Sequence, residues 1–512
     1  MEIVNILTAI TQAPIDLDIN LNFIGKFIEW LINITNVGVG IILFTLVLKL
    51  IVMPFDVYSK IKMKQNSVKM EAMREDLEKL QKQYAHDKNL YNQKMMALQK
   101  KNGYSPLSGC LPLVLSLVIF IVAINAFRSY SAFAMKNEYN EIVDYYNKTV
   151  VELTVEGENP DLFSKDENGK VYFNNANFLN HVSVNESKYA GINSVLKVDS
   201  STGNVTLNVD RENGNVFSTE AENAIKSLLE NEIISDYTDN FKLIDGVYRF
   251  ETNKEETFVA CAKEIINNIE LEYFNSNYKS AVDAAVKEAY EGGKIKVSSF
   301  LWVKNVWLPD VSYEHPINPD VEKFKTSISS AATQSCTCNN AIEVVIENYD
   351  IVTAGLSDQK KSANGYFIMV VLSILTMLLS QFISQKMQKS QLELQTVDGQ
   401  AAMTQKMMLW MMPIMFGMFA FSYSTAFSIY MTVSSIVSTA SSALINLYVE
   451  KKYNKPVELN EGRSKKNIKK IEKAKAEAEE KERQKKEEKL QKKNKSKNND
   501  SSAEKKDFLN KK

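Results

Sequence analysis

Charged side chains are missing from long stretches of this 512-residue chain, and this feature limits its possible folds more than any motif does. Residues 37–55 hold one charged side chain, Lys49, and residues 107–127, 362–385 and 407–449 hold none. A helix needs ~20 apolar residues to cross the ~30 Å hydrocarbon core of a bilayer. The first three stretches can therefore cross once each and the last can cross twice, although charged residues make up 24% of the whole chain.

This pattern predicts an all-α polytopic membrane protein with five spans. We place the spans at residues 36–55, 107–127, 362–385, 407–422 and 426–449.

Charge is also segregated by sign between the predicted spans. Residues 56–106 carry a net charge of +5, residues 129–364 carry −16, and residues 451–512 carry +11. Loops rich in Lys and Arg stay in the cytoplasm. Five spans that begin outside place both positive segments inside and the acidic segment outside. We therefore predict an N-terminus outside and a C-terminus in the cytoplasm, with the short loop 386–406 also in the cytoplasm.

Residues 1–35 are predicted to be an extracytoplasmic segment that contains a short amphipathic helix at 22–34. One face of this helix would carry the apolar residues Phe23, Phe27, Trp30 and Leu31. Such a helix is suited to lie in the interface of the membrane. A loose extension of the first span is the alternative interpretation.

Residues 56–106 are predicted to be a cytoplasmic helical hairpin. Two apolar series with helical spacing are separated by a break at residues 86–89, so two helices could cover each other's apolar stripes. The first series is Met70, Met73, Leu77, Leu80 and Tyr84, and the second is Leu90, Tyr91, Met95, Met96 and Leu98. The Lys-rich faces would be solvated or would contact anionic lipid or RNA.

Residues 128–298 are predicted to be an extracytoplasmic α+β insert, followed by a connector at 299–361. Residues 195–216 alternate apolar and polar side chains around Gly-Asn pairs, which favours strands and hairpins. Thr219 and Glu222 have the spacing of a capping box for a helix that ends at Glu230. Residues 256–290 have helical composition.

The insert shows no catalytic constellation and no phosphate-binding loop, so we expect neither a metal nor a cofactor. Three cysteines, Cys261, Cys336 and Cys338, fall in the segment predicted to be exported, where an oxidising compartment permits a disulfide. Their number is odd, so one or more of them stays free, and a disulfide between two of them is left open.

The C-terminal tail, residues 450–512, is rich in Lys, Glu and Asn and has almost no apolar residues. It cannot bury a core. Its positive charge suits a polyanion, because neutralising phosphates releases counterions. A solubilising tail without a partner is the alternative.

Lys49 is the first functional candidate, because an ionisable group inside a span is costly. The alternative is a lysine near the cytoplasmic end of its span whose long stem reaches the headgroups. Position alone does not separate these two interpretations.

Four motifs occur in an order that is specific as a set. They are TLVLKLIVMPF at 45–55, SPLSGCLP at 105–112, FLWVKNVWLPD at 300–310 and MMPIMFGMFAFSYST at 411–425. Together they resemble the YidC family of membrane protein insertases, over residues 22–128, 299–311 and 362–450. In that family a basic residue, usually Arg, lies where this chain has Lys49.

The resemblance implies a bacterial plasma membrane insertase and chaperone rather than an enzyme. It would insert and help to fold nascent membrane proteins through a hydrophilic groove open to cytoplasm and lipid. Lys49 would attract a substrate carboxylate in this groove, and polar side chains on the second and fifth spans would hydrate it or serve ordinary helix packing. The polar candidates are Ser116, Asn125, Ser428, Thr432 and Ser435.

Methionines crowd the start of the fourth span. Because Met is unbranched and adaptable, they could form an apolar surface that contacts clients, or they could fill gaps between helices. The candidates for this surface are Met408, Met411, Met412 and Met415. The partners implied are nascent membrane protein clients, the ribosome through the basic tail, the lipid bilayer and the Sec translocon.

Two other classes of function remain open from the residues. A transporter or channel could use Lys49 as a binding charge, but the sequence shows no internal repeat or broken span. A sensor with an acidic outer domain would need a cytoplasmic effector domain, and the basic tail is not one.

Overall fold

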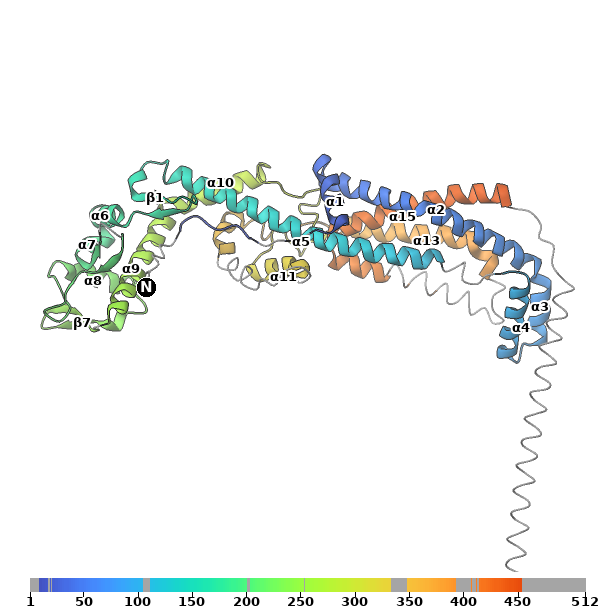
Figure 1. Ribbon diagram of the computed structural model, residues 1–512, viewed down its shortest axis with the longest axis horizontal. Helices are drawn as coiled ribbons and strands as arrows, with labels where there is room; N and C mark the ends of the chain where they lie inside the picture. The colour runs from blue at the N-terminus through green and yellow to red at the C-terminus, as the bar shows by residue number, and fades with distance from the viewer. Residues whose placement is uncertain are drawn as a thin grey trace, which may run out of the picture. The chain divides into compact units, whose positions relative to one another are not determined.

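The computed structural model describes residues 9–16, 19, 21–104, 111–199, 203–252, 254–332, 348–392, 407, 411 and 414–453. The chain divides into two compact units. The first unit comprises Met1–Ile42, Ala123–Val370 and Ala420–Ile429, and the second comprises Leu43–Val122, Val371–Phe419 and Tyr430–Lys512. The described part is mostly helical, with small antiparallel sheets (Figure 1).

Within the described residues, three helices are long and apolar enough to cross a bilayer. They are α2 (Val37–Ala72), α5 (Leu111–Leu153) and α15 (Thr425–Tyr453). A fourth helix, α13 (Ile368–Leu392), has a shorter apolar part, and residues 414–422 are also helical. The chain is therefore a membrane protein with several spans, and the number five remains a prediction.

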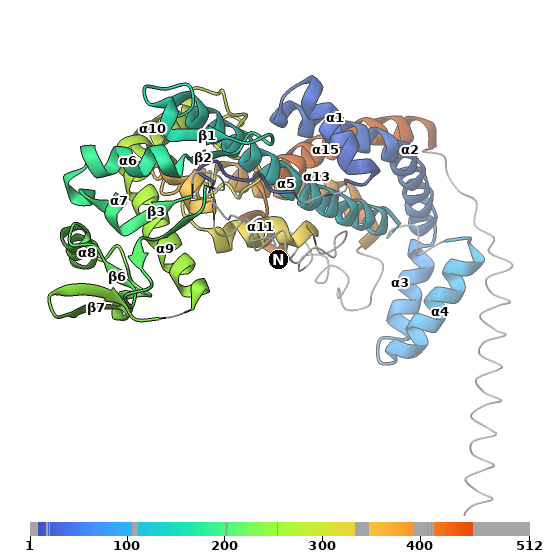
Figure 2. The ribbon, with the colours of Figure 1, turned by 60° about the vertical axis from the view of Figure 1, so that its left-hand side comes forward.

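In the second unit, α3 (Arg74–Gln83) and α4 (Lys88–Lys101) form a helical hairpin (Figure 2). Asp87 begins α4, because its carboxylate accepts a hydrogen bond from the backbone N–H of Leu90 at 2.9 Å. Together with the last turn of α2, the two helices share a buried core made of Met70, Met73, Leu77, Leu80, Tyr91 and Leu98. A helix is present on each side of the predicted break, but the first apolar series is divided between α2 and α3, and Met96 is exposed.

Helix α5 does not end with its apolar segment. It continues without a break to Leu153, although the sequence analysis placed the beginning of the insert at residue 128. Its C-terminal half, in the first unit, buries large side chains at helical spacing, including Tyr139, Ile142 and Tyr146. The change from apolar to mixed composition therefore marks a change of environment and not the end of the helix.

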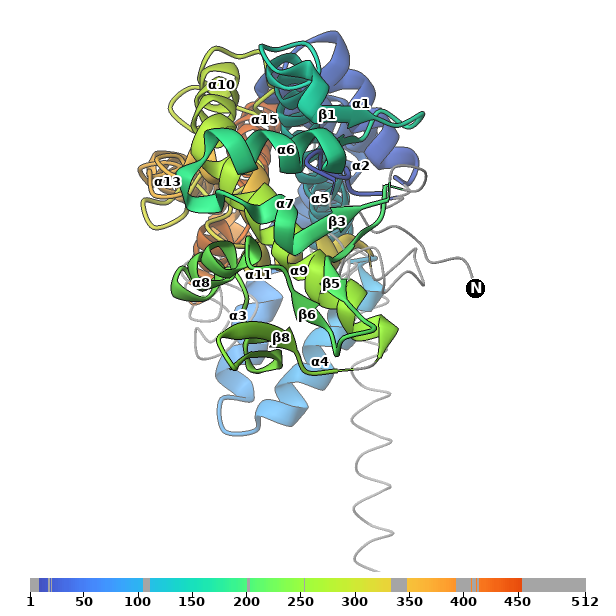
Figure 3. The same cartoon turned by 90° about the vertical axis from the view of Figure 1, so that its left-hand side faces the viewer.

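The first unit also contains short antiparallel sheets (Figure 3). Strand β1 (Phe163–Lys165) pairs with β2 (Val171–Phe173), and β3 (Leu196–Val198) pairs with β4 (Val205–Leu207). A four-stranded sheet has the order β5-β6-β8-β7. Its strands are β5 (Val209–Asp210), β6 (Val216–Phe217), β7 (Phe241–Ile244) and β8 (Val247–Phe250). The strands predicted within residues 195–216 are confirmed.

Helices and short helical turns connect and cover these strands. They are η2 (Pro160–Leu162), α6 (Asn175–Asn185), η3 (Ser187–Tyr189), α7 (Ile192–Val195), α8 (Ala221–Glu230), η4 (Thr238–Asn240), α9 (Glu255–Phe274), the π-helical η5 (Asn275–Lys279), α10 (Ser280–Glu291), α11 (Val321–Ala332) and η6 (Ala354–Leu356). Helix α8 ends at Glu230 as expected. The predicted capping box is wrong, because Glu220 is the N-cap residue and makes no side-chain capping bond.

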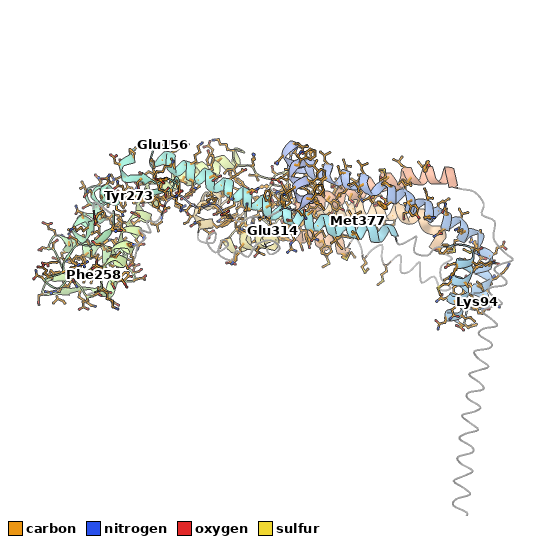
Figure 4. All side chains as sticks on the ribbon, viewed as in Figure 1. Lys94, Glu156, Phe258, Tyr273, Glu314 and Met377 are labelled. Atoms are coloured by element: carbon orange, nitrogen blue, oxygen red, sulfur yellow. The ribbon has the colours of Figure 1, made fainter. Side chains whose placement is uncertain are left out.

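The core of the insert lies between α9 and the strands. Phe258 and Tyr273, both on α9 and labelled in Figure 4, pack against other aromatic side chains. Cys261 on the same helix is a buried free thiol, and burial raises its pKa to about 12. Cys336 and Cys338 lie outside the described residues.

Helix α1 (Phe23–Ile34) is present where an amphipathic helix was predicted, and the amide oxygen of Asn22 caps it by accepting from the N–H of Gly25 at 2.8 Å. Phe23, Trp30 and Ile34 are exposed, whereas Leu31 is buried. The predicted helix is therefore present, and its position in the membrane interface stays a prediction.

Candidate functional site

Lys49 lies on the apolar part of α2, in the second unit, and is hydrogen-bonded to Ser438. Its ammonium donates a hydrogen bond to Ser438 Oγ on α15, with a distance of 2.7 Å between Nζ and Oγ. The side chain is half-buried. The hydroxyl carries no negative charge that would neutralise an ammonium, so an ammonium at this point of the second unit can attract an anion.

Ser438 belongs to a row of hydroxyl groups along α15. The spacing of three and four residues places these hydroxyls on one side of the helix. The row consists of Ser428, Thr432, Ser435 and Ser438. Thr432 is buried and Ser435 is half-buried. The sequence analysis ended this row at Ser435, but the same spacing, continued by one turn, would have found Ser438.

Two further charges follow Lys49 on α2, and the sequence analysis did not single them out. Asp56 is seven residues and Lys60 eleven residues after Lys49, so all three lie on one side of the helix. The carboxylate of Asp56 attracts both ammonium groups. The series begins and ends with a cation, so it keeps a net positive charge.

The predicted groove residues are divided between the two units. Asn125 is exposed on α5 and belongs, like the buried Ser428, to the first unit. Ser116 lies on α5, but its side chain is outside those described. That these three residues line a groove around Lys49 stays a prediction.

Two of the four predicted methionines, Met411 and Met415, lie within the described residues, and both are exposed. Met407 and Met418 are exposed as well, which extends the apolar surface along this helical segment. Met408 and Met412 lie outside the described residues. Helix α13, which carries Met377 (Figure 4), also exposes apolar side chains, as expected of helices that face lipid.

The segment 300–310 forms hydrogen bonds with three helix segments of the first unit: the C-terminal half of α5 and the beginnings of α13 and α15. Asp310 is fully buried, and its carboxylate accepts hydrogen bonds from the backbone N–H groups of Tyr366 and Met369 at 2.8 and 2.6 Å. It thereby caps the beginning of α13. Gly365 is required at this turn, because a Cβ there would lie 1.8 Å from an oxygen of Asp310.

The same segment holds the beginning of α15 and the C-terminal half of α5. The carbonyl of Leu308 accepts from both the backbone N–H and the hydroxyl of Thr425, at 2.9 and 2.7 Å. Asn305 donates to Glu138 on α5 at 3.2 Å. The motif therefore has a structural role that the sequence did not reveal, since it holds three helix segments together.

Comparison with known protein families gives a match that includes Lys49 and the segment 300–310. The sequence profile of the 60Kd inner membrane protein family matches residues 28–160 and 290–452, which is more than half of the chain. The unmatched residues between these two ranges contain the strands of the insert.

Three relatives are named membrane protein insertase YidC. The one from Fusobacterium nucleatum is 33% identical over 113 residues, which are 21% of this chain and 53% of the relative. The one from Caldanaerobacter subterraneus is 31% identical over 113 residues, 22% of this chain and 53% of the relative. The one from Francisella tularensis subsp. novicida is 35% identical over 106 residues, 20% of this chain and 18% of the relative. The chain thus spans about half the length of the first two relatives. No solved structure matches the chain.

Proposed function

The chain belongs to the 60Kd inner membrane protein family, and from this membership we propose that it is a membrane protein insertase and chaperone. It passes nascent membrane proteins into the bilayer without covalent chemistry. The observation that supports this function best is the ammonium of Lys49 held by Ser438 between two apolar helices.

The physical problem of insertion explains why a cation is useful here. The polar tail of a short client must cross hydrocarbon, and its charged carboxylates resist leaving water. A positive charge inside the apolar segment lowers that cost by Coulomb attraction, which is stronger at low dielectric. The hydroxyl row on α15 hydrates the tail, and the exposed methionines contact the apolar part of the client.

The proposed arrangement in the membrane follows the charges. Five spans place the N-terminus outside, the hairpin and the C-terminal tail in the cytoplasm, and the insert outside. The tail carries a net charge of +11 over residues 451–512, which supports contact with ribosomal RNA. Clients, the ribosome and the Sec translocon are its proposed partners.

Reconstitution tests the proposed function. The purified full-length chain is placed in liposomes, and a short single-span client with an acidic tail is synthesised in their presence. Protease protection then measures how much client has crossed. We expect protected client above the level in empty liposomes and above the level with a Lys49→Glu variant at equal protein content. Protection equal to that of empty liposomes would reject the insertase function.

A further inference from the structure

The first unit contains a cavity of about 470 Å³ that the proposed insertion mechanism does not use. Helix α5 lines it with Ile124, Phe127, Arg128 and Ser131, the motif segment with Trp307 and Leu308, and the turn before α15 with Ser424. Glu314, labelled in Figure 4, also belongs to its wall. The volume is enough for the headgroup of one lipid and the first carbons of its chains.

The charges in the wall of this cavity leave one cation uncompensated. Lys323 and Glu314 neutralise each other, with 2.6 Å between Nζ and Oε2. Arg128 is exposed, and within the described residues its guanidinium has no recorded ion pair or hydrogen bond. The cavity therefore carries a net charge of about +1, which matches a single monoanion, and a guanidinium can bind two phosphate oxygens at once.

Trp307 contributes a buried and rigid indole ring to the same wall. Trp307 is 2% exposed, and its indole N–H finds no acceptor among the described residues. The ring is fixed, because it packs on Tyr130 with 4.9 Å between centroids and its backbone carbonyl accepts from the hydroxyl of Ser131. Because the N–H has no accessible surface and the ring is held in place, Trp307 gives the wall a rigid face and does not itself bind the ligand.

Apolar side chains form part of the remaining wall, beside the hydroxyls of Ser131, Ser327, Ser422 and Ser424, and their place in the sequence is informative. Ile124 and Phe127 form the last turn of the apolar segment 107–127, and Arg128 follows directly. Phe427, at the beginning of α15, lies on the wall as well. With the membrane placement proposed above, this is the level where lipid headgroups meet acyl chains. A ligand with a charged head and an apolar body fits such a wall better than a free ion does.

We propose that this cavity binds one anionic phospholipid, whose phosphodiester is bound by the guanidinium of Arg128 and whose chains pack on the apolar part of the wall, at Ile124, Phe127 and Phe427. The bound lipid would fix the outer ends of α5 and α15 together with the motif segment. This site is distinct from the groove at Lys49 and requires no client.

Lipid binding by the full-length chain tests the proposal. The detergent-solubilised protein is titrated with phosphatidylglycerol or phosphatidylcholine, and native mass spectrometry counts the lipids that stay bound. We expect one phosphatidylglycerol to bind at least about tenfold more tightly than phosphatidylcholine. Arg128→Gln should remove this preference, and Arg128→Lys should retain most of it. Lys148→Gln, an exposed change further along α5, is the matched control and should have no effect.

Competition separates the possible sources of the anion. Glycerol 3-phosphate and a short acidic peptide are each added to the lipid-bound protein, and neither should displace the lipid at concentrations where soluble phosphatidylglycerol does. Displacement by glycerol phosphate would show a free phosphate site, and displacement by the peptide would show a polypeptide site. Either result, or equal binding of the two lipids, would overturn the proposal. Because no client is present, the outcome is independent of insertion.

Discussion

A single buried carboxyl group, that of Glu270 on α9, makes the stability of the insert depend on pH. It is 4% exposed, and one of its oxygens has no hydrogen-bond partner among the described residues. Burial raises its pKa from 4.5 to about 8. The folded state therefore holds this proton over a pH range in which the unfolded chain has lost it.

This difference makes the stability of the insert depend on pH. The folded pKa is raised, so the contribution of Glu270 is fully present below pH 4.5 and is lost as the pH rises toward about 8. Glu270→Gln should remove this dependence, because glutamine has no proton to lose.

Labelling of the buried thiol of Cys261, on the same helix, measures the opening of α9. In a full-length chain whose other cysteines are replaced by serine, the labelling rate of the wild type divided by that of Glu270→Gln should rise about tenfold or more between pH 5 and pH 8. The ratio cancels the titration of the thiol itself. A ratio that does not change with pH would show that Glu270 does not titrate in this range.

The contact of Lys49 shows what a sequence can and cannot reveal about a residue. Lys49 stands out because it is the one charge in an apolar stretch, so its importance could be predicted. Its partner could not, because Ser438 lies 389 residues away and resembles every other hydroxyl of α15. The spacing of the row identifies a side of the helix but not which hydroxyl meets the ammonium.

At the scale of elements, the segment 300–310 determines where α13 begins. Both carboxylate oxygens of Asp310 accept a hydrogen bond from a backbone N–H. In Asp310→Asn one of these oxygens becomes an NH₂ group, which cannot accept. The free energy of unfolding should therefore fall by about 2–3 kcal/mol. Asp320 offers a matched control, since it caps α11 with one bond of 2.7 Å and is exposed. Asp320→Asn should cost about 1 kcal/mol or less. Thermal unfolding of both variants in detergent measures the difference, and equal costs would contradict the role given to Asp310.

The elements were predicted to different degrees for identifiable reasons. The hairpin could be predicted because each of its helices repeats apolar residues at helical spacing and Asp87 supplies a cap. The length of α5 could not, because a helix continues through a change of polarity when its next turns find a protein surface to cover. Its buried tyrosines, Tyr139 and Tyr146, meet such a surface in the insert and connector.

The topology of the whole molecule can be tested by labelling. In a chain without native cysteines, Glu167→Cys in the insert and Lys79→Cys on α3 are both exposed positions. A membrane-impermeant maleimide added to intact cells should label position 167 and not position 79, because the acidic segment is proposed to lie outside and the basic hairpin inside. Both positions should react after the membrane is permeabilised. Labelling of position 79 in intact cells would reject the five-span topology.

The basic tail can be tested for contact with the ribosome at the same scale. Removal of residues 455–512 should weaken co-sedimentation with ribosomes, and binding of the intact chain should fall steeply as salt is raised. Binding that survives the truncation and does not depend on salt would show that the tail is only solvated.

The central claim is that the charge of Lys49 draws the acidic tail of a client into the membrane. The most direct measurement compares insertion of two clients, identical except for an acidic or a neutral tail, by liposomes with equal amounts of each Lys49 variant. Lys49→Arg should retain insertion of the acidic client, Lys49→Ala should lose about tenfold, and Lys49→Glu should lose more, because attraction becomes repulsion. The neutral client should be affected much less, and Lys60→Ala should preserve the difference between the clients. Equal losses for both clients at equal protein content would contradict the electrostatic account.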